Sequence, residues 1–314
     1  MNEFELIRRY FTRATPGALL GVGDDAALLQ ASADKVLAVS SDMLVSGIHF
    51  FSDANPFQLG HKALAVNLSD MAAMGASPRW VTLAIALPDI DQVWLEKFSA
   101  GFFALAQQHG VELVGGDTTR GPLNICVTII GEVPANQVLC RSGARVDDEI
   151  WVSGIIGDAA LALAHLQNRI KLSDADFALC APALHQPQPR VALGVALRGI
   201  ASSAIDLSDG LLGDLGHILA ASKVGAEIEF ARLPVSAVMR RVERVQQLAL
   251  SGGDDYELCF TAPATRHAEI LRIGAQLELS LTRIGKVVAV RGCIVHDADG
   301  NPINVESASY DHFR

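Results

Sequence analysis

Basic residues are scarce in this chain, which carries 25 Lys and Arg against 35 Asp and Glu, for a formal charge of −10. A chain this acidic does not bind nucleic acid through its bulk charge and is not attracted to an anionic membrane. Aromatic residues make up only 6% of the chain, but half of all residues are hydrophobic. This composition can fill a large core, which excludes a disordered, collagen-like or small disulfide-stapled protein. An anionic ligand would therefore need some attraction other than the net charge.

Paired cysteines and long apolar runs are also missing. The five cysteines are scattered and never spaced as C-x-x-C, which argues against a disulfide framework or a zinc site. The first residues, MNEFELIRRYF, lack the basic-then-apolar order of a signal peptide. No apolar run approaches the roughly 18 residues that a membrane span requires. The sequence predicts a soluble cytoplasmic protein with neither a nucleic-acid partner nor a membrane.

Short apolar runs alternate with longer helical patterns, which favours an α/β (α+β) fold, and 314 residues suggest about two domains. The polar, turn-rich segment 134–149 predicts a boundary between domains at 1–137 and 138–314. Strands are expected at 35–40, 111–114, 124–130 and 149–153. Helices are expected at 56–74, 92–109, 159–167 and 211–221, and a hairpin turn at 297–300.

Aspartates beside small residues recur at the ends of apolar segments. Each such pair alone is more often a turn or a helix cap than a ligand site. Six segments of this kind in one chain favour a cluster of carboxylates that cations hold together, and Mg²⁺ prefers such oxygen ligands. The segments are GVGDD (21–25), SSD (40–42), NLSD (67–70), GGD (115–117), DLSDG (206–210) and GGDD (252–255).

Asp70 is the least cap-like of these residues. A helical step of about 100° places it in the middle of the apolar stripe of the expected helix 56–74. A carboxylate buried there must be paired with a basic group or coordinate a metal. A structural salt bridge is one interpretation, and the ligand interpretation is favoured because few basic residues lie nearby.

The familiar nucleotide-binding motifs are absent, including G-x-x-x-x-G-K-[ST], a complete G-x-G-x-x-G and the H-R-D kinase loop. The amides of segment 153–158 could bind a phosphate, or they could form a tight structural turn. Arg141 could clamp phosphates or be a solvated surface arginine. His49 could donate to an anionic substrate or be a structural histidine.

Several longer segments resemble, in order, the motifs of the thiamine-monophosphate kinase family. They are GVGDDAALL, AVSSDMLVSGIHF, KALAVNLSDMAAMGASP, LVGGDTTRGP, LCRSGA, AIDLSDGLLGDLGHI, SGGDDYELCF and the closing YDHF. The resemblance runs from about residue 21 to residue 313, nearly the whole chain. It implies the two-domain fold shared with aminoimidazole-ribotide synthetase, and a homodimer formed through the N-terminal strands.

The resemblance also implies ATP-dependent phosphorylation of thiamine monophosphate to thiamine diphosphate, with several Mg²⁺ ions and ATP as co-substrate. Among the residues that carry over, Asp42 and Asp117 position catalytic metal and Arg141 adds a fixed positive charge. The implied metal ligands are Asp25, Ser40, Ser41, Asp42, Asp70, Asp117, Asp206 and Asp209. The implied contacts to ATP are Gly116, Asp117, Arg141 and Ser208, and the implied contacts to the thiamine substrate are His49 and Asp254.

The chain departs from the family pattern at three positions. Ser41 replaces the usual Thr, and Asp254 replaces a Glu that is often present, which shortens that side chain. The family commonly has an aromatic residue near Ser307 that could stack on the substrate ring, and here that aromatic residue is either missing or replaced by Tyr310 or Phe313.

Two alternative functions remain open from the sequence. One is another ATP-dependent enzyme of the same superfamily, similar to aminoimidazole-ribotide synthetase. The other is a non-catalytic sensor that binds a nucleotide or a thiamine phosphate. A complete set of carboxylates argues against the sensor, since a binding protein has little need for so many metal ligands.

Overall fold

The computed structural model describes residues 2–303 and divides the chain into two compact units. Unit 1 comprises Met1–Met71 and Ala76–Asn136, and unit 2 comprises Ala72–Gly75 and Gln137–Arg314. Over the described residues, no helix is both long enough and apolar enough to cross a membrane.

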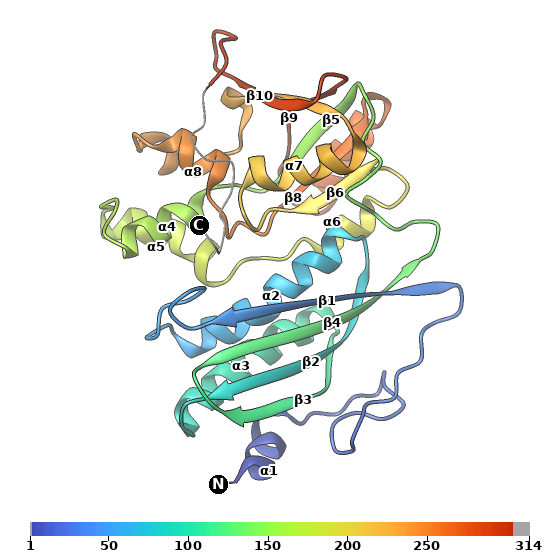
Figure 1. The fold of residues 1–314 in the computed structure, drawn as a ribbon, viewed down its shortest axis with the longest axis vertical. Coiled ribbons are helices and arrows are strands. Elements are labelled where there is room, and N and C mark those ends of the chain that lie inside the picture. The colour runs from blue at the N-terminus through green and yellow to red at the C-terminus, as the bar shows by residue number, and fades with distance from the viewer. Residues whose placement is uncertain (1, 304–314) are drawn as a thin grey trace. The chain divides into compact units, whose positions relative to one another are not determined.

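Unit 1 is a four-stranded sheet with helices against one face (Figure 1). The strand order is β1-β4-β2-β3; β2 and β3 are parallel, and the other two neighbouring pairs are antiparallel. Its elements are α1 (Glu3–Leu6), η1 (Ile7–Phe11), β1 (Lys35–Val45), α2 (Pro56–Ala73), β2 (Ser77–Leu87), α3 (Gln92–His109), β3 (Glu112–Arg120) and β4 (Asn124–Pro134).

The ends of α3 coincide with the predicted range 92–109, because both caps are local signals. The Asp91 side chain accepts hydrogen bonds from the amides of Val93 and Trp94, and Gly110 ends the helix at φ 63°. Helix α2 ends at Ala73, one residue before the predicted end.

The strands of unit 1 are longer than predicted. The sequence predicts a strand over 111–114, but β3 continues to Arg120 through Gly115 and Gly116. Glycine disfavours strands locally, and here pairing with residues 82–87 of β2 outweighs that preference. Strand β1 likewise extends to Val45 because β4 pairs with it along its whole length.

Unit 2 contains a six-stranded mixed sheet in the order β10-β7-β9-β5-β8-β6. The β10–β7 pair is parallel and the other neighbours are antiparallel. Its strands are β5 (Asp148–Ser153), β6 (Ser203–Asp206), β7 (Gly225–Glu229), β8 (Leu258–Pro263), β9 (Leu281–Val288) and β10 (Gly292–His296). Its helices are α4 (Asp158–Leu166), α5 (Asp174–His185), α6 (Val191–Ala196), α7 (Leu211–Ser222), α8 (Val245–Ser251) and α9 (His267–Gln276), with the short turns η2 (Phe230–Arg232), η3 (Met239–Arg241) and η4 (Ala264–Arg266).

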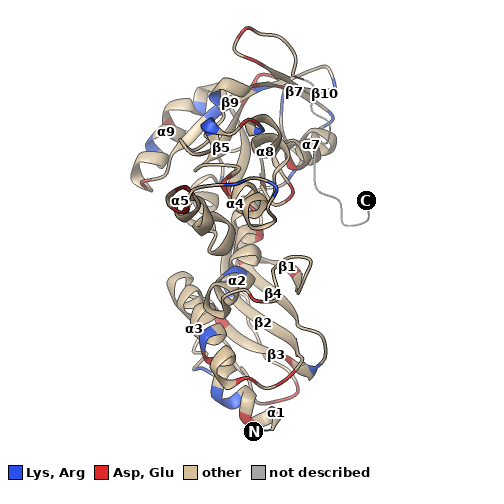
Figure 2. Ribbon diagram, turned by 90° about the vertical axis from the view of Figure 1, so that its left-hand side faces the viewer, with Lys and Arg blue, Asp and Glu red and all other residues tan. Residues whose placement is uncertain are grey.

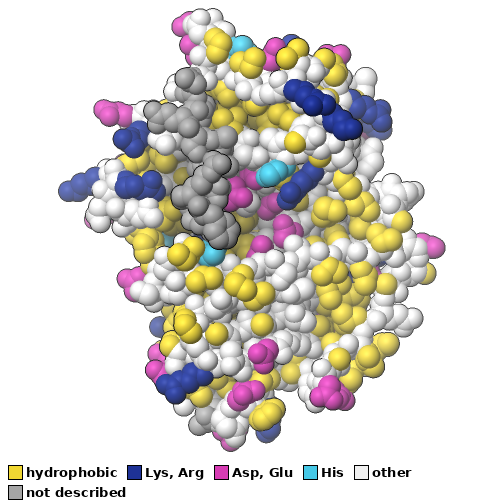
Figure 3. Space-filling view, viewed as in Figure 1, with side chains coloured by type: hydrophobic (Ala, Val, Ile, Leu, Met, Phe, Trp, Pro, Cys, Tyr) yellow, Lys and Arg dark blue, Asp and Glu magenta, His cyan; other side chains and the backbone are white. Residues whose placement is uncertain are grey.

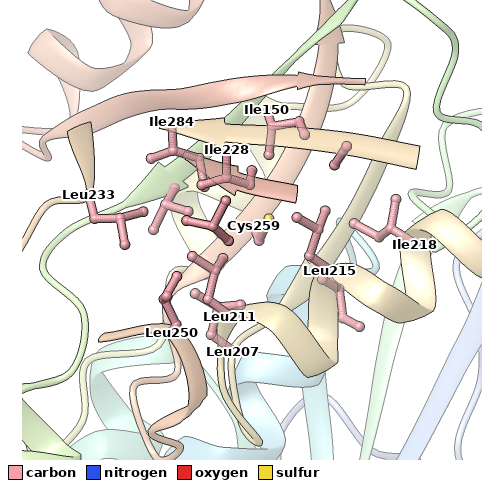
Figure 4. Packing of buried hydrophobic residues seen from close by; sticks show 14 of the residues in the cluster. Ile150, Leu207, Leu211, Leu215, Ile218, Ile228, Leu233, Leu250, Cys259 and Ile284 are labelled. Carbon is pink, nitrogen blue, oxygen red and sulfur yellow. The ribbon is translucent and has the colours of Figure 1, made fainter. Parts of the chain in front are cut away.

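The core of unit 2 forms where α7 packs on the sheet (Figure 4). Leu211, Leu215 and Ile218 recur at helical spacing on α7 and meet Ile150 and Ile228 from the strands. This packing fixes the start of α7, and with it the loop 206–210 that precedes the helix. Acidic and basic residues occur in both units (Figure 2).

The expected elements at 149–153, 159–167 and 211–221 agree with β5, α4 and α7 to within one residue at each end. The expected turn at 297–300 is present, and the Gly300 amide donates to the Asp297 carbonyl oxygen at 3.2 Å. Up to residue 303, the segment after the turn pairs with β10 through one isolated bridge, between His296 and Pro302.

Candidate active site

Strand β1 and helix α2 bring together three of the predicted metal ligands. Ser40 and Asp42 alternate along β1 on the side that faces α2. The Ser40 hydroxyl donates to the Asp70 carboxylate at 2.5 Å, and the Asp42 amide donates to the Asn67 side chain at 3.2 Å. Asp70 is half-buried on α2. The residues Ser40, Asp42 and Asp70 thus form one polar group beside the edge of the sheet.

Ser41 lies on the other face of β1, because successive strand residues point to opposite sides. Its hydroxyl lies 2.9 Å from the Thr128 hydroxyl of β4. The Ser41 side chain is therefore separated from the Ser40 hydroxyl and the Asp42 carboxylate.

A second group of predicted residues lines a pocket of about 650 Å³ in unit 1. Asp25, Gly116 and Asp117 all contribute to its wall, together with residues of α1 and η1. Gly116 has φ +147°, and a Cβ at this position would lie 1.9 Å from the Leu83 carbonyl oxygen. Glycine is therefore required at 116, and it leaves the backbone accessible to a ligand beside the exposed Asp117.

The two groups in unit 1 belong to opposite edges of the sheet. Asp42 lies on β1 and Asp117 on β3, with β4 and β2 between them. Three strand spacings place the two backbones roughly 14 Å apart, and Mg²⁺ binds oxygen at about 2.1 Å. One ion cannot join both carboxylates within a single chain. Within residues 2–303, no three His, Cys, Asp or Glu side chains are gathered closely enough to hold a metal ion by themselves.

His49 lies in the loop that follows β1. Its Nδ1 accepts a hydrogen bond from the Val45 amide at 2.9 Å. Because Nδ1 is the acceptor, the proton of the neutral ring is on Nε2, which makes Nε2 a donor suited to an anionic group.

In unit 2, the loop 206–210 carries Asp206, Ser208 and Asp209 between β6 and α7. The buried carboxylate of Asp214 holds this loop by accepting the amides of Asp209 and Gly210 at 3.0 and 3.1 Å. Burial, with added repulsion from Asp206 and Asp209, raises the pKa of Asp214 to about 7. Several negative charges thus gather here, an arrangement that a bound cation would stabilise.

Asp254 lies in a segment that is hydrogen-bonded to the same loop. The Asp254 amide donates to the Ser208 carbonyl oxygen, and the Tyr256 amide donates to that of Leu207, both at 2.8 Å. A Cβ at Gly253 would lie 2.4 Å from the Ser208 oxygen, so the two backbones approach too closely for another residue at 253. Ser208, a predicted contact to ATP, and Asp254, a predicted contact to the thiamine substrate, are therefore adjacent in unit 2.

Arg141 is exposed on the segment between the predicted domain boundary and β5. The backbone on either side of it is fixed, since the Cys140 carbonyl oxygen accepts the Ala204 amide and the Gly143 amide donates to the Ser222 hydroxyl. The guanidinium thus projects from an anchored backbone, where it can reach an anionic ligand.

Segment 153–158 is a structural turn with its amides already occupied. The amides of Gly154 and Ile156 donate to the carbonyl oxygens of Ser280 and Pro234. The Gly157 amide donates to both oxygens of Asp255, at 2.8 and 2.9 Å. These three donors are therefore not available to a phosphate.

The buried carboxylates that support the loops of unit 2 are Asp214, Asp255 and Glu257. The sequence analysis did not single out Asp214 or Glu257, and it included Asp255 only in the segment GGDD (252–255), without its role as an anchor. Each is at least nine-tenths buried. Glu257 accepts from the Ser153 hydroxyl at 2.5 Å and from Arg190 Nε at 2.6 Å. The available signal was DDYE directly before an apolar strand, because charged residues so close to a buried strand require partners. Tyr310 and Phe313, the predicted stacking residues, lie outside the described residues.

The donors at these positions suit magnesium in type. They are carboxylates and hydroxyls, and Mg²⁺ is commonly held by one or two carboxylates together with water and substrate phosphates. Burial is the largest cause of the raised pKa of Asp214, and repulsion from Asp206 and Asp209 adds to it, so acidic groups lie close together in this loop. Each of these positions offers only a few protein ligands. That number suits Mg²⁺ ions whose remaining ligands come from a phosphate-bearing substrate.

Comparison with known proteins places the chain in a family. Models of the AIR synthase related protein match residues 23–133 with the N-terminal domain and residues 145–298 with the C-terminal domain. Thiamine-monophosphate kinase of Escherichia coli K12 is 49% identical over 99% of this chain and 98% of its own length. The Haemophilus influenzae enzyme is 42% identical over 100% and 98%. The chain belongs to the thiamine-monophosphate kinase family.

Solved structures agree with this family membership. Thiamine-monophosphate kinase from Stenotrophomonas maltophilia K279a superposes with a TM-score of 0.86 at 47% identity, over 96% of each chain. A structure of AaThiL complexed with AMPPCP and TMP superposes with a TM-score of 0.79 at 29% identity, over 90% of this chain and 89% of that one. The predicted α/β fold with two AIR synthase-related domains is confirmed.

Proposed function

We propose that this protein transfers the γ-phosphoryl group of ATP to the phosphate of thiamine monophosphate, giving thiamine diphosphate and ADP. The observation that carries the proposal is 49% identity, over nearly the full length of both chains, to a relative named thiamine-monophosphate kinase. The structural similarity to AaThiL complexed with AMPPCP and TMP supports the same pair of substrates.

The reaction is a direct phosphoryl transfer that needs no strong general base. The second pKa of a phosphate monoester is about 6, so the acceptor oxygen is already ionised at neutral pH. This oxygen forms a bond to the γ-phosphorus as the bond to the bridging β,γ-oxygen breaks, and ADP leaves. The difficulty is the repulsion between two anions, which the protein must offset.

Unit 1 supplies one part of the binding machinery. Two separate groups would hold Mg²⁺ ions: Asp42 with Ser40 and Asp70, and Asp117 with Asp25. The ions would neutralise phosphate charge and stabilise the transferring group. The exposed backbone of Gly116 lies in the wall of the pocket, where a phosphate can approach it. The Ser41 hydroxyl lies on the far side of β1, so we assign metal binding at this position to the Ser41 backbone.

Unit 2 supplies the other part. Asp206 and Asp209 would hold Mg²⁺, while Ser208 and the exposed Arg141 contact ATP, Arg141 as a fixed cation. Asp254, on the neighbouring segment, contacts the thiamine portion of the acceptor. The thiazolium ring is cationic and the pyrimidine ring carries an amino donor, both of which suit a carboxylate. His49 of unit 1, with its donor at Nε2, also contacts the thiamine substrate.

We expect the enzyme to be a homodimer that forms through the sheet of unit 1. Strand β1 is an edge strand, and its outward face carries Leu37, Val39 and Met43, which are 47%, 63% and 54% exposed. Figure 3 shows hydrophobic and uncharged side chains over this side of unit 1. A long apolar edge strand exposed to water favours association with another chain. We expect the protein in the cytoplasm, where its five free cysteines stay reduced.

The test is an incubation of the purified protein with ATP, Mg²⁺ and thiamine monophosphate, followed by chromatography of the thiamine phosphates. The proposal predicts thiamine diphosphate in the absence of any aminoimidazole precursor. Binding of ATP and thiamine monophosphate without product would instead identify a sensor. Turnover that requires an aminoimidazole precursor would identify the synthetase-like alternative.

A further inference from the structure

The segment 254–257 has a backbone that its residue types disfavour. Asp254 has φ 72° and Tyr256 has φ 50°, both in the left-handed region that residues with a Cβ rarely adopt. Such conformations persist only where surrounding contacts enforce them, and they cluster at functional sites. Contacts with the surrounding structure must therefore hold this backbone in place, and its unusual conformation points to a function.

Asp255 and Glu257, which alternate with Asp254 and Tyr256 along the segment, hold the backbone in this conformation. Asp255 and Glu257 are 9% and 5% exposed. The Asp255 carboxylate accepts the Gly157 amide with both oxygens, and Glu257 binds Ser153 and Arg190. These partners lie about seventy to one hundred residues away in the sequence. The loop is thus fixed by its buried side chains before any ligand binds.

The result is that the side chains of Asp254 and Tyr256 meet. Both residues are half-buried, and the Tyr256 hydroxyl donates to Asp254 Oδ1 at 3.1 Å. A hydrogen bond from a neutral donor to a carboxylate limits the rotation of the side chain. The family often has Glu at this position, and Asp254 is shorter. The Asp254 carboxylate can therefore move less to adjust its own position.

We propose that Tyr256 is a positioning residue for substrate specificity. Its hydroxyl holds the Asp254 carboxylate in the orientation that accepts the positively charged or amino-bearing end of the acceptor. This inference rests on the proposed function, since it takes thiamine monophosphate as the ligand of Asp254. The Tyr256 hydroxyl acts through Asp254, and its removal leaves the binding of ATP and the transfer itself unchanged.

A double-mutant cycle with Tyr256→Phe and Asp254→Gly tests the proposal. Phenylalanine keeps the ring and removes only the hydroxyl, and glycine tolerates the φ of 72° while removing the acceptor. Loss of one hydrogen bond to a charged group is expected to raise the KM for thiamine monophosphate about tenfold to a hundredfold in Tyr256→Phe. The kcat and the KM for ATP should stay within about twofold. In the Asp254→Gly background, Tyr256→Phe should have no further effect.

Tyr10→Phe is the matched control, because it removes a buried hydroxyl that has no hydrogen-bond partner, and the KM values should not change. An unchanged KM for thiamine monophosphate in Tyr256→Phe would overturn the proposal. An equal effect with and without Asp254, or a Tyr256→Phe chain that does not fold, would also overturn it. A wild-type protein that forms no thiamine diphosphate contradicts the proposed function itself, which separates the two failures.

Discussion

The two units hold their proposed ligand-binding carboxylates in different ways. In unit 1, Asp42 and Asp117 stand on strands whose backbones are fixed by the sheet. In unit 2, Asp209 and Asp254 stand on loops that depend on the buried carboxylates Asp214 and Asp255. A strand keeps its conformation when one exposed side chain is replaced. A loop loses its conformation when the buried side chain that anchors it is removed. Substitutions in unit 1 should therefore alter chemistry alone, and anchor substitutions in unit 2 should alter both stability and activity.

The largest expected effect is that of Asp42→Asn. The substitution removes a charged metal ligand and leaves the β1–β4 pairing intact, so kcat should fall by about a hundredfold to a thousandfold. The melting temperature without ligands should stay within about 2 °C of the wild type. Steady-state kinetics and thermal unfolding measure the two quantities. Near-normal turnover would refute the metal-ligand assignment of Asp42.

Glu257→Leu tests the expectation that replacing an anchor in unit 2 alters both stability and activity. It leaves the Arg190 guanidinium beside an apolar side chain, and removing one partner of a buried pair costs about 3–5 kcal/mol. Because the Arg190 side chain is 24% exposed, we expect the lower end, about 3 kcal/mol of unfolding free energy. The KM for thiamine monophosphate should rise as well, since Glu257 anchors the Asp254 segment.

The matched control is Glu227→Leu, which breaks the exposed pair with Lys286 in the same unit. Its cost in denaturant titrations should stay below about 1 kcal/mol. Equal costs for the two variants would mean that the buried pair has no special role.

Asp255→Asn should change how stability depends on pH. Burial raises the pKa of Asp255 well above its ordinary value of 3.8, so the folded protein holds this proton more tightly than the unfolded chain. The stabilising contribution is complete below about pH 4 and is lost as pH rises through the raised pKa. Asparagine cannot ionise, and its side-chain oxygen can still accept the Gly157 amide.

Denaturant titrations of the ligand-free protein between about pH 5 and pH 9 measure this effect. Asp255→Asn should lose less stability over that range than the wild type, while the exposed Asp299→Asn should follow the wild type. If Asp255→Asn and the wild type lose stability in parallel, Asp255 does not titrate over this range.

The smallest effect concerns the exposed face of β1. Val39→Asp places a charge on the apolar face that we expect to join two chains, so the mass in solution should halve. Light scattering coupled to size exclusion measures it, with Val290→Asp as a control because Val290 is 78% exposed in unit 2. A wild-type monomer, or a Val39→Asp dimer, would show that this face does not form the interface.

Local signals predicted much of the fold, and long-range contacts account for the rest. Helix α3 was predicted at its observed ends because Asp91 and Gly110 mark them in the sequence. Strand β3 was predicted too short, since only its pairing with β2 carries it past Gly116. In the candidate site, recurring aspartates pointed to segments 206–210 and 252–255, and the structure joins these two segments by backbone hydrogen bonds. The partners of the anchoring carboxylates were not predictable, because Asp255 accepts its hydrogen bonds from an amide 98 residues away.

The proposed reaction is a direct transfer of the terminal phosphoryl group of ATP to thiamine monophosphate. An incubation with ATP labelled with radioactive phosphorus at the γ position, Mg²⁺ and thiamine monophosphate follows both the label and ADP. We expect the label in thiamine diphosphate, one molecule for each ADP formed, and none attached to the protein. Label released as inorganic phosphate without thiamine diphosphate would refute direct transfer.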